Sequence, residues 1–388
     1  MPFFHNRAAL LAGALLATSA CGGNGAVPSN AVASNPSLQV GVPQERAISP
    51  DDNTSILKKL KKDVVVGSTI DPTNGDTGPR SISRVITSYG KLKKGQLVVC
   101  NFADSSGTAG NGTSIDVLAS TPGSKPTTFI QSSKIQGCDG NALSSANNTY
   151  GAGLTSHIVV KYDQNGKYVK TYGAPINAPM TTGDAFCGQP YAPEDIYAGD
   201  SEDGGVTKFA AGLYGNPKPV EVITGFGVNK GSGWGVLGPS GIQYNGTRHG
   251  SLCNDTLYIV DGVDNTIVAV SKASNLLTTG EIVVQPGGKT FKCKQKRFTC
   301  ATLVYSGSPL NAPVALAILP NGNLIAANTQ GGNKLVEISA AGKVLAVKAV
   351  DKSSIAHVFG LVASGSSDSN TVLFYTDTKD NSVHELEP

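Results

Sequence analysis

The strongest constraint on the fold is a repeated pattern of two short strands around an Asx-containing turn. Residues 258–270 (YIVDGVDNTIVAV) align without a gap on residues 374–386 (FYTDTKDNSVHEL). Each copy has an apolar run, an Asp, a turn with Asp-Asn and a second alternating run, which predicts a β-hairpin. Looser copies begin at LVVCN (97–101), DIYAGD (195–200) and LIAAN (324–328). Such a unit cannot bury its apolar face alone, so the body of the chain is predicted to be a repeat fold.

Two further elements complete the repeating unit. VVKYDQNGKYV (159–169) aligns with LVEISAAGKVL (335–345), and each is predicted as two strands joined by a glycine turn. Short strands rich in small residues, at 239–244 and 313–318, precede the Asx-ended strands. One unit is therefore four antiparallel strands, which is the blade of a propeller. The six units fall at about 70–120, 121–173, 176–225, 235–285, 308–350 and 355–388. We expect an all-β, six-bladed β-propeller over residues 61–388.

Composition excludes the main alternatives. Hydrophobic residues make up 39% of the 388 residues and charged residues 15%, which is too apolar and too weakly charged for a disordered chain. The 47 glycines would break a helical bundle. A net charge of only +3 gives no general argument for nucleic-acid binding, so we expect none.

The first 21 residues have the pattern of a targeting segment. A short basic head precedes an apolar run at 8–17, which is ten residues long and too short to span a bilayer. We therefore predict a signal peptide over residues 1–21. Small residues before Cys21 resemble a bacterial lipobox, although Thr18 stands where Leu is usual. The resemblance implies lipidation of Cys21.

The same resemblance implies an address. Gly22, in place of Asp, favours sorting to the outer membrane, so we expect an outer-membrane lipoprotein or a periplasmic protein, with a secreted protein as the alternative. Residues 22–60, which begin with a long run of Gly, Ser, Asn, Pro and Ala, are predicted to be a flexible linker. The run LKKLKKD (57–63) is predicted to be a solvated approach to the first blade.

Cysteine usage fits an oxidising compartment. If Cys21 carries lipid, six of the seven cysteines remain, which is an even number. Cys293 and Cys300 flank a short segment and are predicted to close a hairpin by a disulfide. The remaining four can pair in three ways, and their spacing does not choose among them: Cys100, Cys138, Cys187 and Cys253.

The blade pattern resembles that of NHL-type six-bladed propellers, and it is most similar to that of secreted bacterial members. The segments that carry the likeness are 257–270, 311–338, 357–365 and 373–386, and the likeness extends over about 60–388. The gluconolactonase/regucalcin family shares this general architecture. Its members hold a divalent metal at the channel mouth through carboxylate and Asn side chains, so the likeness implies a divalent cation such as calcium as a possible cofactor.

Five residues that end the second strand of a blade are candidate ligands at the channel mouth. If the blades follow the usual order, these side chains ring one face, and hard cations prefer several oxygen ligands of this kind. The alternative is that each closes its own turn by bonding nearby backbone. The five are Asn101, Asp200, Asp261, Asn328 and Asp377.

His357 is the candidate catalytic base. It precedes the inner strand of the last unit, so it is predicted to lie near the channel mouth and near Asp377, where it would suit hydrolysis. The alternative is a hydrogen-bonded loop histidine.

A basic loop at 288–298 (GKTFKCKQKRF) is a candidate anion-binding loop. It would suit an anionic polymer or phosphate groups, and the alternative is a solvated tip. Its candidate residues are Lys292, Lys294, Lys296 and Arg297.

No catalytic triad, nucleophile elbow or zinc motif occurs in the sequence. We therefore expect a binding or scaffold module of the cell envelope or the secreted space. The alternative is a metal-dependent hydrolase of lactonase type, although no Glu stands at an inner-strand start. Expected partners are an envelope protein or a glycan, with the membrane contacted only through the lipid anchor, and the chain is expected to be a monomer.

Overall fold

The computed structural model describes residues 53–185, 195–210, 218–229, 237–249 and 252–388. All of them belong to one compact unit, Val42–Pro388. Within these residues no helix combines the length and apolar character needed to cross a membrane. The predicted signal peptide, Cys21 and most of the predicted linker lie outside the described residues.

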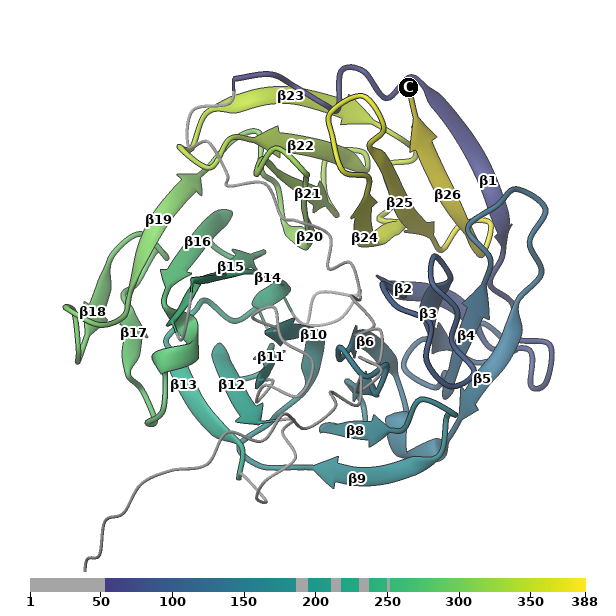
Figure 1. Ribbon diagram of the computed structural model, residues 1–388, viewed down its shortest axis with the longest axis horizontal. Coiled ribbons are helices and arrows are strands. Elements are labelled where there is room, and N and C mark those ends of the chain that lie inside the picture. Colours follow the sequence, from purple (N-terminus) through teal and green to yellow (C-terminus); the bar gives the residue numbers. More distant parts are fainter. Residues whose placement is uncertain (1–52, 186–194, 211–217, 230–236, 250–251) are drawn as a thin grey trace, which may run out of the picture. The chain divides into compact units, whose positions relative to one another are not determined.

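The described chain forms six sheets in sequence order, and their strand pairs are antiparallel except for one parallel pair at the outer side of the third sheet (Figure 1). The first blade contains β2 (Thr77–Arg84), β3 (Leu97–Ala103), β4 (Ser114–Leu118) and β5 (Thr127–Gln131). The second contains β6 (Cys138–Leu143), β7 (Thr149–Gly153), β8 (Ile158–Tyr162) and β9 (Tyr168–Tyr172). The third begins with β10 (Pro179–Ala185), β11 (Asp195–Asp200), β12 (Gly205–Ala210) and β13 (Val220–Thr224).

The other three blades follow the same order, with two exceptions in their outer strands. The fourth blade contains β14 (Pro239–His249), β15 (Leu252–Asp261), β16 (Thr266–Ser271) and, after an insertion, β19 (Cys300–Ser306). The fifth contains β20 (Pro313–Ile318), β21 (Leu324–Asn328), β22 (Lys334–Ile338) and β23 (Val344–Ala349). The sixth contains β24 (Val358–Ser364), β25 (Val372–Asp377), β26 (Ser382–Glu387) and, as its outer strand, β1 (Lys62–Ser68).

The inner strands close a ring. Each of β2, β6, β10, β14, β20 and β24 contacts the next, and β24 contacts β2 (Figure 1). The predicted six-bladed propeller of four-stranded blades is therefore confirmed. Closure depends on β1, which pairs with β26 and so joins the two ends of the described chain in one sheet. The ring therefore covers the faces of each sheet with its neighbours and leaves only short inner edges around the central cavity.

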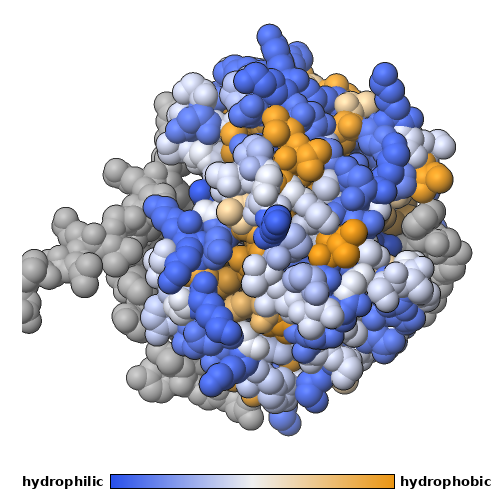
Figure 2. Space-filling view, turned by 90° about the vertical axis from the view of Figure 1, so that its right-hand side faces the viewer, coloured by the Kyte–Doolittle hydropathy of each residue, from blue (hydrophilic) through white to orange (hydrophobic). Residues whose placement is uncertain are grey.

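The core lies between neighbouring blades rather than along the axis. Six hydrophobic clusters each join one blade to the next, and together they complete the ring. Figure 2 looks at the side of the ring that β1, β4 and β5 form, and it shows a largely hydrophilic surface with scattered hydrophobic patches. The division follows from the strands, whose apolar side chains face the adjacent blade.

The approach to the first blade differs from the prediction. Leu57 and Leu60, with Ile56, are fully buried in the cluster between the fifth and sixth blades. The lysines between them are exposed, so the spacing LKKLKK places leucines on one side of a turn and lysines on the other. The prediction of a solvated segment is thus wrong for the leucines, which fix residues 55–60 to the body of the propeller.

The fourth blade also differs from its predicted limits. Residues near 282–284, predicted to end this unit, form β17 (Ile282–Val284) and pair with β13 of the third blade. The outer strand of the fourth blade is β19 instead.

Candidate functional site

The five Asx residues mark the same position in five blades. In four of these blades the Asx residue lies opposite the first residue of the inner strand, and in the first blade it lies opposite the third residue of β2. A β-bulge follows at each of these points. The opposing residue is proline in four blades, and in three of them this proline begins the strand, which is favourable because proline lacks an N–H to donate to the ladder. The pairs are Pro79 with Asn101, Pro179 with Asp200, Pro239 with Asp261, Pro313 with Asn328, and Val358 with Asp377.

Four of these side chains bond to their own turn or to the loop that leads into the blade. Asp261 Oδ1 accepts from the backbone N–H of Val263, and Asp377 Oδ1 accepts from that of Lys379, both at 2.8 Å. Asn328 accepts from the backbone of the entering loop and donates back to it. Asp200 accepts from the N–H of Asn177 and from a Thr hydroxyl. These contacts favour the turn-closing interpretation of the Asx residues.

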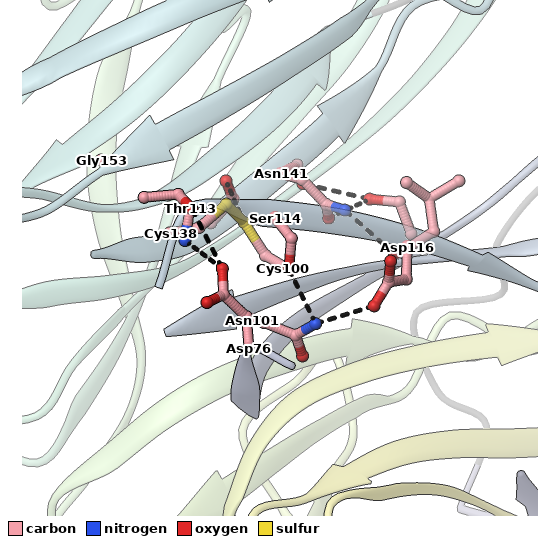
Figure 3. The surroundings of a disulfide bond; sticks show 12 residues. Asp76, Cys100, Asn101, Thr113, Ser114, Asp116, Cys138, Asn141 and Gly153 are labelled. Atoms are coloured by element: carbon pink, nitrogen blue, oxygen red, sulfur yellow. Dashed lines mark hydrogen bonds between the residues drawn. A yellow bond between two sulfur atoms is a disulfide. The ribbon is translucent and has the colours of Figure 1, made fainter. Parts of the chain in front are cut away.

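Asn101 differs, because it joins a buried polar network beside the disulfide that links Cys100 to Cys138 (Figure 3). Its Nδ2 donates to Asp116 Oδ2 at 2.8 Å and to Ser114 Oγ at 3.1 Å, and its Oδ1 has no partner. Burial, together with the nearby Asp71 carboxylate, raises the pKa of Asp116 to about 9. Asp116 is therefore protonated at neutral pH and serves the network as a neutral group.

His357 lies in a hydrogen-bonded loop. Its Nε2 is 3.1 Å from Ser353 Oγ and 4.0 Å from an oxygen of Asp351, and its Nδ1 is 3.4 Å from Thr378 Oγ1. The structure records no hydrogen bond or ion pair between this ring and Asp377 in the part of the chain described. The catalytic role predicted for His357 therefore has no support in these contacts.

A different histidine lies close to Asp377. Asp377, Asp380 and His384 each bring one potential ligand atom within 4.8 Å of the others, the one group of this kind among the described residues. Both ring nitrogens of His384 are already engaged, by Asp63 at 3.0 Å and by Asp380 at 3.1 Å. Asp200 and Asp261 do not join the group, so a calcium site built from the Asx ring stays a prediction.

The inner strands line a cavity of about 200 Å³ at the centre of the ring. Near the starts of these strands, the buried guanidinium of Arg80 lies 4.0 Å from the ring centre of Phe102 and 4.1 Å from that of Phe359. It also lies 3.4 Å from Asp139 Oδ1, while Asp139 Oδ2 has no partner. Burial raises the pKa of Asp139 to about 6, against the opposing effect of Arg80. This end of the cavity thus holds a paired cation.

Arg84, the last residue of β2, lines the same cavity without such a partner. Its side chain is half-buried, and burial alone lowers the pKa of its guanidinium. Its Nε has no hydrogen-bond partner, and no ion pair to Arg84 occurs among the described residues. Since a strand advances ~3.3 Å per residue, Arg84 lies about 13 Å along β2 from Arg80.

Sequence reasoning missed the cavity residues Arg80, Arg84 and Asp139. One signal was available, because aligning the inner strands on their first proline places Arg84 where the fifth blade has Ile318 and the fourth has Tyr244. An arginine at a position that is apolar or aromatic in other blades is a departure from the repeat.

Together, the ring of blades and its axial cavity define the class, a six-bladed β-propeller. No family model matches the sequence, and no curated protein matches it. Among solved structures, a catalytically inactive virginiamycin B lyase from Staphylococcus aureus is similar, with a TM-score of 0.45 and 12% identity over 84% of this chain and 98% of that one. The nidogen/laminin complex gives a TM-score of 0.48 and 14% identity over 76% and 89%. A structural genomics protein of unknown function from Bacteroides thetaiotaomicron gives 0.47 and 10% over 83% and 74%.

Proposed function

We propose that this protein is a binding module of the NHL type, acting in the cell envelope or the secreted space. Its central cavity takes a small ligand that carries a carboxylate or phosphate group. The proposed location rests on residues 1–21 and the lipobox-like Cys21. The single observation that supports the ligand class is Arg84, a half-buried cation in the cavity with no hydrogen bond or ion pair to it among the described residues.

The chemistry of Arg84 selects an anion. A guanidinium offers five N–H donors in a planar fork, and a carboxylate or phosphate matches that fork with two parallel hydrogen bonds. Inside a cavity walled by protein, such a bond is stronger than at an open surface, because less water competes for the charges.

Arg80 is a poorer candidate for the same task. It is packed between two phenylalanine rings and already paired with Asp139. A ligand would have to displace a buried ion pair to reach it, which is costly. Arg84 needs no such exchange, so we assign the ligand's anionic group to Arg84.

The hydrolase alternative receives less support from the contacts. Four Asx side chains use oxygens to bond backbone N–H groups of turns and loops, which leaves them poorly placed as a shared ligand set. The divalent cation therefore remains a prediction from resemblance and forms no part of the proposed function.

The test is calorimetric titration of the full chain with two probes, citrate and inorganic phosphate. We expect at least one probe to bind, and Arg84→Gln to weaken that binding by on the order of 10- to 100-fold, the range for a charge-assisted hydrogen bond. Arg84→Lys keeps the charge but loses the fork, so an intermediate affinity is expected.

Lys91→Gln is the matched control, because it removes an exposed cation just beyond β2. It should leave the affinity unchanged. The proposal is wrong if neither probe binds, or if Arg84→Gln binds both probes as tightly as the unaltered protein does.

A further inference from the structure

The insertion between β16 and β19 is braced across two blades. It contains η2 (Ala273–Asn275), β17 and β18 (Phe291–Cys293). β17 pairs in parallel with β13 of the third blade, and β18 then forms the outermost strand of that sheet, at the rim of the ring (Figure 1). The Cys293–Cys300 disulfide ties β18 to the first residue of β19 in the fourth blade. The disulfide prediction is confirmed, but the bond links two sheets rather than two strands of one hairpin.

The insertion concentrates positive charge. Residues 272–299 contain five Lys and one Arg against a single acid, Glu281, which gives a net charge of +5. The whole chain has +3, so the remaining residues sum to −2. Four exposed cations surround the disulfide, and no ion pair to them occurs in the described part of the chain: Lys292, Lys294, Lys296 and Arg297.

Apolar side chains stand among these cations. Leu277 and Phe298 are 70% and 63% exposed, the highest values among the large hydrophobic residues described. The buried carboxylate of Glu281 holds their two loops together. Its Oε2 accepts from the backbone N–H of Leu277 at 2.7 Å, and its Oε1 accepts from Gln295 Nε2 at 3.0 Å.

We infer that this braced hairpin, residues 272–299, docks on a membrane surface that carries anionic phosphate lipids. Clustered Lys and Arg are attracted to such a surface, and exposed Phe and Leu gain free energy when they enter the headgroup region. A soluble polyanion would use the cations but offers nothing to the two apolar side chains. Because the disulfide and Glu281 fix both loops in advance, docking costs little conformational entropy.

The test is co-sedimentation of the full chain with lipid vesicles. The chain carries Cys21→Ser, so that acylation cannot account for binding. Vesicles of phosphatidylethanolamine with roughly 30% phosphatidylglycerol are compared with vesicles of phosphatidylcholine alone. We expect binding to the anionic vesicles at about 50 mM salt, and its loss at about 500 mM, where charges are screened within a few ångströms.

Matched variants test whether vesicle binding depends on the cations of this hairpin or on the positive charge of the protein in general. Lys292→Gln, Lys296→Gln and Arg297→Gln together should weaken binding by on the order of 100-fold, about fivefold for each cation near the surface. Removal of the same number of exposed lysines elsewhere should change binding by less than about twofold. That control combines Lys58→Gln, Lys61→Gln and Lys94→Gln.

The apolar part is tested by Phe298→Ser, which should weaken binding about tenfold. Its control is Tyr89→Ser, another exposed aromatic residue, 55% exposed. The inference is overturned if the protein binds neutral vesicles as tightly as anionic ones. It is also overturned if the triple variant of the hairpin and its triple lysine control lose vesicle binding to the same extent. A third result would also overturn it: the protein binds heparin, and Phe298→Ser does not change its binding to vesicles. That result indicates a soluble polyanion as the partner. Arg84→Gln should bind vesicles normally, so this inference can fail or succeed independently of the proposed cavity ligand.

Discussion

The seam that closes the ring and the junction between the first two blades hold separate strands together by different means. At the seam, β1 pairs with β26 through backbone hydrogen bonds, and Asp63 and Tyr375 contact each other and His384 across it. At the junction, a disulfide joins Cys100 of β3 to Cys138 of β6. The seam has no covalent bond among the described residues, although the segments that it joins are more than 300 residues apart in the chain: Lys62 pairs with Glu387.

The second blade differs from the other five at the position of the turn-closing residue. At the position where five blades have an Asx residue opposite Pro or Val, this blade has Gly153 opposite Cys138. Glycine offers no side chain to close the turn. A Cβ on the nearby Gly151 would lie 3.1 Å from the side chain of Ile115 in the first blade, so the two blades approach closely. The second blade, which lacks the turn-closing residue, is thus fixed to the first blade by a disulfide.

The largest predicted loss of stability comes from releasing the N-terminal segment, residues 55–60, which precedes the seam strand β1. Glu337 is fully buried and accepts hydrogen bonds from Ser55, from the backbone of Ile56 and Leu57, and from Asn323. Glu337→Ala leaves these buried donors without an acceptor, which should lower the free energy of unfolding by about 4 kcal/mol. Urea unfolding monitored by circular dichroism measures the change.

Glu337→Gln is the informative companion, because it keeps one acceptor oxygen and nearly the same shape. It should fall between the unaltered protein and the alanine variant. An alanine variant that unfolds at the same urea concentration as the unaltered protein would show that residues 55–60 do not support the seam.

The second-largest predicted loss of stability comes from removing the disulfide at the junction between the first two blades. Cys100 and Cys138 are 38 residues apart, whereas Cys293 and Cys300 are 7 apart. In the chain-entropy model, closing the longer loop stabilises by about 3–4 kcal/mol and the shorter one by about 2.5 kcal/mol. The double variant Cys100→Ser with Cys138→Ser should therefore lose more stability than Cys293→Ser with Cys300→Ser. If urea unfolding shows the larger loss for the Cys293 and Cys300 variant, the disulfide is not the main support of the junction between the first two blades.

Local patterns were sufficient to predict the blades. The Asx turns and the glycine turns are encoded within about a dozen residues, so the alignments 258–270 with 374–386 and 159–169 with 335–345 revealed the four-stranded unit. The number of blades followed from counting the units. Each of these features depends on neighbours in sequence, which is why sequence alone contained them.

Features that join distant residues could not be predicted in this way. The pairing of β17 with β13 crosses from one blade to another and leaves no local pattern. The contact of His384 with Asp63 depends on the register of β1 against β26, two strands that lie more than 300 residues apart in the chain. Arg84 has a defined environment only because strands from several blades converge on the cavity. The candidate site was thus less predictable than the fold.

The smallest predicted effect is a dependence of the stability of the seam on pH. Burial lowers the pKa of His384, but hydrogen bonds to Asp63 and Asp380 outweigh burial and raise it overall. Burial raises the pKa of Asp63, but hydrogen bonds from His384 and Tyr375 outweigh burial and lower it overall. The histidine contribution is complete below its unfolded pKa, about 6.5, and is lost as pH rises through the raised value. The Asp63 contribution is present above its unfolded pKa, near 3.9, and is lost as pH falls through the lowered value.

Both contributions therefore coincide between about pH 4 and 6.5, where the seam is most stable. His384→Asn should lower the thermal midpoint most in this window, by the equivalent of less than ~1 kcal/mol because the groups are partly exposed, and the loss should shrink by about pH 9. A loss in His384→Asn that is the same at all pH values would mean that packing against Tyr375, 4.9 Å away between ring centres, rather than charge, holds the histidine in the seam.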